Sequence, residues 1–214
     1  YLCSPNNPTG TYSTIEEITR LEARLPEGVL LILDAAYAEF VTADDYDCGI
    51  RTLFDPDGRV VVTHTFSKAH GLAALRIGWA AAPTSVVQAV SRIRTPFNAN
   101  SAALRAAEAA IFDQVHLGEN VARINATRER FRAALTALGI SVVQSQTNFI
   151  LLTFDGDGDE AHDLDRALQD AGILGRPVTG DANEFRISIG SDEEIDLTLQ
   201  VITAWAAQRS GAAA

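Results

Sequence analysis

Two short aliphatic runs, each followed directly by polar residues, constrain the fold of this chain more than any other feature. Residues 29–33 lead into Asp34, and residues 60–62 lead into the polar segment 63–68. Short apolar runs that alternate with helical segments are typical of a largely parallel sheet. The carboxyl ends of parallel strands meet at one edge of an open α/β sheet, where ligands bind, so the sequence predicts a binding site at this edge.

The periodicity of apolar residues divides the chain into two predicted domains. Residues 1–118 are predicted to be an α/β domain with a mostly parallel sheet, and residues 119–214 to be a smaller C-terminal α+β domain that includes a long connecting helix. Capping boxes predict helix starts at Ser13 with Glu16 and at Ser191 with Glu194. The other predicted elements are a strand at 77–82, a helix at 101–116, the long helix at 120–138, strands at 142–143, 148–153 and 184–189, and helices at 161–171 and 192–208.

The composition of the chain argues against several classes of protein. A net charge of −11 disfavours nucleic acid binding, which needs clustered Lys and Arg. No apolar run approaches the length of a membrane span, and no basic and apolar leader opens the chain, so we expect a cytoplasmic protein. Cys3 and Cys48 are too few for a disulfide scaffold, and we predict that both are reduced.

Metal and nicotinamide sites are also disfavoured. The four histidines show no metal-ligand spacing, and no Gly-x-Gly-x-x-Gly motif is present. The acidic stretch 155–159 resembles the start of a calcium loop, but Glu160 and Arg166 stand where such a loop needs Gly and a carboxylate. We therefore predict no metal site and a solvated acidic turn at 155–159.

Three segments concentrate the residues that can carry chemistry. Residues 4–10 read Ser-Pro-Asn-Asn-Pro-Thr-Gly, residues 34–37 read Asp-Ala-Ala-Tyr, and residues 65–78 begin with Thr-Phe-Ser-Lys and end with Leu-Arg-Ile-Gly. Their order and separations resemble those of the fold-type I aminotransferases, which use pyridoxal 5′-phosphate (PLP). Residues 92–98 and 183–190 are similar to those of the histidinol-phosphate aminotransferase subgroup. The resemblance covers almost the whole chain and implies an aspartate aminotransferase-like fold, with residues 1–118 as the C-terminal part of the PLP-binding large domain.

The same resemblance implies a cofactor-binding role for the polar residues at the predicted sheet edge. Lys68 would attach PLP covalently and move the proton between the substrate Cα and the cofactor. Asp34 would pair with the pyridine nitrogen, and Asn7 and Tyr37 would donate hydrogen bonds to the phenolic oxygen. Two hydroxyl groups and a cation would hold the phosphate. The implied cofactor-binding residues are Asn7, Asp34, Tyr37, Thr65, Ser67, Lys68 and Arg76.

A substrate site is implied as well. Arg186 would bind an α-carboxylate through its planar fork, for which Lys is a poor substitute. Arg176 matches a position that helps to bind the substrate's phosphate in the histidinol-phosphate subgroup, and Asn7 would also contribute. The resemblance therefore implies transamination of histidinol phosphate, with 2-oxoglutarate and glutamate as the other pair.

Some features of the family are not found in this sequence. A backbone cup for the phosphate, an aromatic residue that stacks on the PLP ring and a tyrosine from the partner subunit lie upstream of the segment 4–10 in that family. We therefore expect that Tyr1 lies inside a longer protein and that this chain alone binds PLP poorly. We also expect the full-length parent to be a homodimer.

Other functions stay open at this stage. An aromatic amino acid aminotransferase and a PLP-dependent decarboxylase of a phosphorylated amino acid fit the same motifs, because motifs do not show which bond at Cα is held perpendicular to the ring. An inactive fragment that serves only as a binding or dimerisation module is an alternative of another class. Each motif alone also has a simpler explanation, such as a turn for residues 7–10, a helix cap for Asp34 and an edge cation for Arg186.

Overall fold

The structure is a computed structural model that describes residues 1–51, 55, 58–155, 159–178 and 183–212. Contacts divide the chain into two compact units. The first consists of Tyr1–Asn7 and Thr11–Val121, and the second of Pro8–Gly10 and Ala122–Ala214. The boundary after Val121 falls within one long helix, α4 (Gln114–Ala137). The acidic turn expected at 155–159 lies largely outside the described residues.

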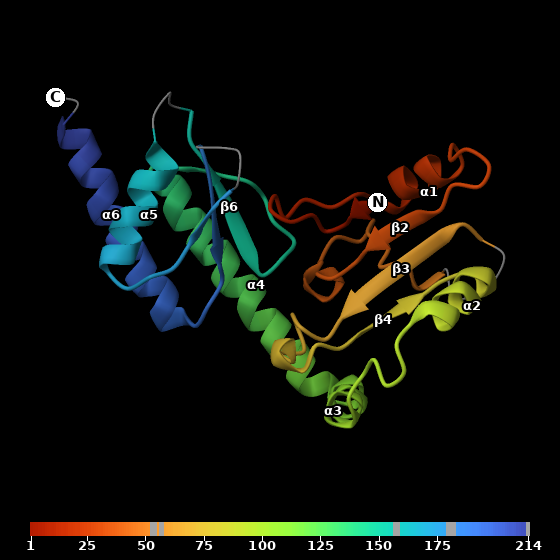
Figure 1. The fold of residues 1–214 in the computed structure, drawn as a ribbon. Coiled ribbons are helices and arrows are strands. Elements are labelled where there is room, and N and C mark those ends of the chain that lie inside the picture. The colour runs from red at the N-terminus through yellow and green to blue at the C-terminus, as the bar shows by residue number, and fades with distance from the viewer. Residues whose placement is uncertain (52–54, 56–57, 156–158, 179–182, 213–214) are drawn as a thin grey trace. The chain divides into compact units, whose positions relative to one another are not determined.

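A four-stranded sheet forms the centre of the first unit (Figure 1). Its strands are β1 (Leu2–Cys3), β2 (Leu31–Asp34), β3 (Val60–Thr65) and β4 (Gly78–Ala81), in that order. The pairs β1–β2 and β2–β3 are parallel, and only β3–β4 is antiparallel. The expectation of a mostly parallel sheet is therefore confirmed. The helices of this unit are α1 (Ile15–Glu22), α2 (Thr84–Ile93) and α3 (Ser101–Phe112), with 3-10 turns at Ala38–Phe40 and Ala73–Leu75.

The two faces of this sheet differ in burial. Leu31 and Leu33 of β2 pack with Val60 and Val62 of β3 and with Ile18 of α1, and all five side chains are buried. The alternate residues of both strands point to the opposite face and are only half-buried. Those alternate positions include Asp34 and its register partner Thr63, so the carboxylate predicted to bind a cofactor lies on the less covered face.

The first residues of α1 correct one prediction. The capping box consists of Thr14 and Glu17, whose backbone N–H groups each bond to the other residue's side chain, not of Ser13 and Glu16. The backbone N–H of Ser13 instead donates to the hydroxyl of the buried Ser4, 2.9 Å away. This tertiary hydrogen bond holds Ser13 outside the helix and moves the start by one residue.

The second unit is built around an antiparallel sheet (Figure 1). The order of its strands is β5 (Ser141–Val142), β6 (Phe149–Thr153), β8 (Glu184–Ser188) and β7 (Arg176–Pro177). Helices α5 (Glu160–Asp170) and α6 (Asp192–Ala212) complete it together with the second part of α4. The capping box of Ser191 and Glu194 at the start of α6 is confirmed. Among the described residues, no helix is both long and apolar enough to cross a membrane.

The turn at Pro8–Gly10 is held by a loop of the second unit. Gly10 is buried and has a φ of +76°, a conformation that side chains other than glycine's rarely adopt. Its carbonyl accepts a hydrogen bond of 2.8 Å from the backbone N–H of Gln146. A Cβ atom at this position would lie only 2.2 Å from the Ser145 hydroxyl oxygen. The turn therefore needs glycine both for its backbone and for its packing.

We expect Gly10→Ala to lower the free energy of unfolding by about 3 kcal/mol, because backbone strain and overpacking act together. The matched control is Gly28→Ala, since Gly28 has the same φ of +76° but no described atom lies within 4 Å of the place that a Cβ atom would take. That control should cost only about 1 kcal/mol, which is the strain alone. Urea unfolding of both variants measures the difference, and equal losses would show that the Ser145 contact does not select glycine.

Candidate active site

The polar residues singled out in the first unit gather at one edge of its sheet. Because β1, β2 and β3 are parallel, their carboxyl ends meet there. Asn7 lies in the turn after β1, Asp34 ends β2, and Thr65 ends β3 just before Lys68. This is the edge of an α/β sheet at which ligands bind.

The carboxylate of Asp34 is fixed at the end of β2. Its Oδ1 accepts a hydrogen bond of 3.1 Å from the backbone N–H of Ala36, and its Oδ2 accepts one of 3.3 Å from the hydroxyl of the exposed Tyr1. The negative charge of Asp34 raises the pKa of the Tyr1 phenol, because the phenolate would be repelled. One oxygen of the carboxylate is thus held by the backbone, whereas the other is bonded to an exposed side chain.

Tyr37 and Lys68 are brought together at this edge. Tyr37 is buried, and the Nζ atom of Lys68 lies 5.2 Å from the centroid of its ring, in cation–π geometry. The turn after Lys68 is closed by hydrogen bonds from Gly71 to the Lys68 carbonyl and from Leu72 to the Phe66 carbonyl. Lys68 is also the only lysine in the sequence. Counting the lysines would have singled it out without any motif.

The segment 65–76 brings together hydroxyl groups and a guanidinium that could donate hydrogen bonds to an anion. The backbone N–H of Ser67 donates to the Thr65 hydroxyl at 3.0 Å, and the Arg76 guanidinium lies 3.5 Å from the Ser67 hydroxyl. Arg76 also donates to the Ala73 carbonyl at 2.7 Å. Its own backbone is left-handed, with φ 54° and ψ 51°. Such strain persists where the surroundings fix it and is concentrated at functional sites.

The segment that carries Asn7 is anchored by residues that the sequence did not single out. The Tyr46 hydroxyl donates to the carbonyl of the buried Ser4 at 2.8 Å, and the Asn6 backbone N–H donates to the Thr11 carbonyl at 2.7 Å. Burial of the Tyr46 phenol raises its pKa far above the ordinary value. No local pattern marks Tyr46, because its partner Ser4 is distant in the sequence.

In the second unit, Arg176 and Arg186 are direct partners. Arg176 of β7 stands opposite Arg186 of β8 in antiparallel register, so both side chains leave the same face of the sheet. The guanidinium of Arg186 also lies 4.9 Å from the ring centroid of Phe149. Two like charges directly opposite each other are unfavourable by themselves. The pair is therefore suited to an anion that both guanidinium groups can bind.

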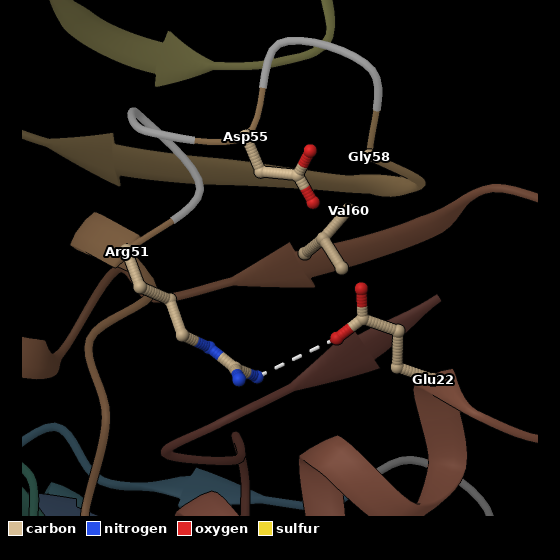
Figure 2. A pocket seen from close by; sticks show the side chains of 5 residues that line it. All are labelled: Glu22, Arg51, Asp55, Gly58 and Val60. Carbon is tan, nitrogen blue, oxygen red and sulfur yellow. Dashed lines mark ion pairs between the residues drawn. The ribbon is translucent and has the colours of Figure 1, made fainter.

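A cavity of about 120 Å³ lies elsewhere in the first unit (Figure 2). Glu22, at the end of α1, pairs with Arg51 at 3.6 Å, and Asp55, Gly58 and Val60 complete the lining. Val60 begins β3, whereas Thr65 ends it. The cavity therefore lies at the amino end of this strand, away from the edge that carries Lys68.

The side chain of His64 does not join the group at the sheet edge, because it points to the other face of the sheet. It stacks on Trp79 with ring centroids 4.3 Å apart, and its Nε2 lies 2.9 Å from the Cys48 carbonyl. His64 shares the face of Val62 and is therefore on the opposite face from Thr63 and Asp34. In the described part of the chain, no group of three or more His, Cys, Asp or Glu residues could hold a metal ion.

Comparisons with known proteins identify the family of this chain. Residues 1–202 match the family model of aminotransferase class I and II. Histidinol-phosphate aminotransferase of Nitrobacter hamburgensis is 44% identical over 212 residues, which is 98% of this chain and 58% of that protein. The structure of histidinol-phosphate aminotransferase from Sinorhizobium meliloti in complex with pyridoxal-5′-phosphate has a TM-score of 0.86 and 31% identity, and covers 97% of this chain and 57% of that one.

A decarboxylase has a similar structure as well. L-threonine-O-3-phosphate decarboxylase from Porphyromonas gingivalis has a TM-score of 0.80 and 26% identity, over 95% of this chain and 62% of that one. The chain therefore spans less than two thirds of the length of each of these relatives.

We expect the stability of the protein to fall as pH rises above about 10, because unfolding frees the Tyr46 phenol to ionise at its ordinary pKa. Since the folded-state pKa is raised, this contribution to stability is complete below the unfolded value and is lost above it. Tyr46→Phe should remove most of the decline, at a cost of about 1 kcal/mol at neutral pH for the lost hydrogen bond.

Urea unfolding at a series of pH values measures this difference. The comparison variant is Tyr12→Phe, which alters a half-buried tyrosine that packs edge-on against Tyr46. The hydrogen bond to Asp45 raises the pKa of Tyr12 as well, but less than burial raises that of Tyr46, so this variant should remove a smaller part of the decline. An alkaline slope in Tyr46→Phe equal to that of the unchanged protein would contradict the assignment.

Proposed function

This chain belongs to the aminotransferase class I and II family, and from that premise we propose that its protein is a PLP-dependent aminotransferase acting on histidinol phosphate. The other substrate pair is 2-oxoglutarate and glutamate. The observation that carries the proposal is the Lys68 amine beside Tyr37, on the same segment as the Ser67–Arg76 pair. The identity of 44% to a histidinol-phosphate aminotransferase supports the substrate.

The donor set at the sheet edge fits PLP. An amine, a carboxylate, a phenol and a phosphate site of hydroxyls with a guanidinium are the groups that this cofactor requires. Asp34 can keep a ring nitrogen protonated once the exposed Tyr1 hydroxyl moves from Oδ2. When bound, PLP supplies an electron-withdrawing ring that stabilises negative charge at the substrate Cα.

Each residue at this edge then has a distinct task. Lys68 holds the cofactor covalently and moves a proton at the substrate Cα. Tyr37 and Asn7 would donate hydrogen bonds to the phenolic oxygen of the cofactor. The residues that grip the phosphate are Thr65, Ser67 and Arg76.

The two opposed arginines explain how one site accepts two kinds of substrate. Glutamate presents a carboxylate at Cα, whereas histidinol phosphate carries a phosphate ester in its place. Arg186 alone can bind the carboxylate through its fork, and Arg176 adds a second cation for the phosphate dianion. Their register pairing on β7 and β8 supports this division, and Asn7 is the third residue proposed to bind the substrate.

Assembly and location are part of the same proposal. Residues 1–118 form the C-terminal part of the PLP-binding domain and residues 119–214 form the small domain of a homodimeric, cytoplasmic protein. Exposed apolar side chains on α2 and α3, such as Ile93 at 82% and Phe112 at 81%, support burial against further polypeptide.

A decarboxylase of a phosphorylated amino acid is the second candidate, favoured by the similarity to L-threonine-O-3-phosphate decarboxylase. The same arginine pair could bind such a substrate. Product analysis separates the two functions, since transamination converts 2-oxoglutarate to glutamate and decarboxylation releases carbon dioxide. An aromatic amino acid aminotransferase would instead turn over phenylalanine in preference to histidinol phosphate.

We expect a form of the protein that spans the full length of these relatives to bind PLP with a visible absorption band. Borohydride reduction should then fix the cofactor on Lys68 of this segment, and mass spectrometry of its peptides locates the adduct without ambiguity because residues 1–214 contain no other lysine. Lys68→Arg keeps the positive charge and serves as the matched control that forms no adduct. Absence of an adduct in the unchanged protein would refute a PLP enzyme and leave a binding or dimerisation module.

A second prediction concerns the substrate. Arg176→Gln should raise the KM for histidinol phosphate about tenfold to hundredfold, the loss expected for one charge-assisted contact, with little change for glutamate. Arg186→Gln should impair both substrates. The control is Arg166→Gln, which removes an exposed cation of α5 that pairs with Asp163. Steady-state kinetics decides, and equal effects of Arg176→Gln on both substrates would exclude its role in phosphate binding.

A further inference from the structure

A buried arginine in α4 has no part in the site described so far. Arg128 is only 3% exposed, and burial lowers the pKa of its guanidinium. Nη1 donates to the Asn125 side-chain oxygen at 2.7 Å and to the Thr147 carbonyl at 2.9 Å, and Nε donates to Glu129 at 3.1 Å. Burying a cation costs free energy unless it is paired and hydrogen-bonded. The burial of Arg128 therefore needs a structural or functional explanation.

The main-chain partner of Arg128 belongs to a compact buried loop between β5 and β6. Ser145 and Thr147 are 1% and 0% exposed. Their hydroxyl groups lie 2.8 Å apart, and the Thr147 N–H donates to the Ser145 hydroxyl at 3.1 Å. The loop thus satisfies its hydroxyl groups internally and presents the Thr147 carbonyl to Arg128.

This loop is connected to candidate site residues in two directions. At Gln146, its backbone N–H holds the Gly10 carbonyl, in the turn that follows Asn7. At Asn148, its carbonyl accepts a hydrogen bond of 2.8 Å from the backbone N–H of Ile189, the residue that follows β8. That strand carries Arg186 and pairs with β6 throughout its length. The loop therefore links the turn after Asn7 with the strand of Arg186.

We propose that Arg128 is a positioning residue that locks the loop 145–148, and thereby holds the Pro8–Gly10 turn and the Arg186 strand in the geometry that binds substrate. This role in substrate binding rests on the proposed aminotransferase function. Arg128 acts through the Thr147 carbonyl and touches neither substrate nor cofactor.

The neighbouring charges favour this role over a surface ion pair. Glu129 is shared between Arg128 and Arg132, which donates to it at 2.9 Å. Burial opposes ionisation of Glu129, but the hydrogen bonds from Arg132 and Arg128 outweigh it and lower its pKa. Arg132 is 37% exposed and makes its contact on the same helix, whereas Arg128 reaches the loop. Arg132 is therefore a suitable control for Arg128, because both contact Glu129 but only Arg128 contacts the loop.

The first test is hydrogen exchange of the Gln146 amide in the 214-residue chain, which requires no activity. In Arg128→Met, which keeps an unbranched apolar stem but removes the guanidinium, the Thr147 carbonyl loses its charged donor, and exchange at Gln146 should quicken about tenfold or more. In Arg132→Met the exchange should match that of the unchanged chain. Wild-type exchange in Arg128→Met would overturn the proposal even if the protein is an aminotransferase.

The second test is kinetic and uses the form that spans the full length of the relatives. Arg128→Met should raise the KM for both substrates about tenfold, the loss expected for a weakened charge-assisted contact, while the absorption band of lysine-bound cofactor and kcat change little. A fall in kcat with an unchanged KM would overturn the role in substrate binding. Failure of the unchanged protein to bind PLP would refute the proposed function, whereas the exchange result would still decide whether Arg128 locks the loop.

Arg128→Lys covers the case in which Arg128→Met does not fold. Lysine keeps the buried charge but ends one bond short of the Nη1 position, and so cannot reach Asn125 and Thr147 in the same way. We expect Gln146 to exchange faster than in the unchanged chain, though less so than without any cation. Wild-type exchange in Arg128→Lys would show that charge alone is sufficient and would overturn the proposed lock.

Discussion

The parallel pairing of β1, β2 and β3 is the constraint on which the arrangement of the first unit depends. It places the ends of three strands at one edge and so brings together segments that begin at residues 4, 34 and 65. The hydrogen bonds from Ser4 to the Asp34 carbonyl and from Ala35 to the Thr63 carbonyl continue this pairing beyond the strands. Because main-chain groups make this pairing, it does not require the side chains of Asp34 and Thr65, which can serve a ligand.

The positions of these strands follow from local sequence, and for that reason they could be predicted. Residues 29–33 and 60–62 are aliphatic and end in polar residues, and the observed strands lie within about two residues of their predicted start and about three residues of their predicted end. The same holds for the capping box of Ser191 and Glu194. The predicted start of α1 was wrong because the backbone N–H of Ser13 donates to the hydroxyl of Ser4. This contact is not part of the helix-capping pattern that a local sequence shows.

Features that depend on contacts between distant segments were not accessible from the sequence. The opposition of Arg176 and Arg186 depends on strand register, which no single strand encodes. The hydrogen bond of Tyr46 to Ser4 and the insertion of Gly10 against Ser145 likewise join segments that are far apart in the chain. The resemblance to a family predicted the roles of individual residues, but the contacts that those residues make depend on the fold.

The opposition of Arg176 and Arg186 also bears on how such a site could evolve. The β8 strand is fixed by its long pairing with β6, but β7 consists of two residues and, among the described strands, is tied to β8 alone. A shift of β7 by one position against β8 would turn Arg176 to the other face of the sheet. Under the role proposed for Arg176, a one-residue change in the register of β7 would be enough to gain or lose a phosphate-bearing substrate, with both arginines retained.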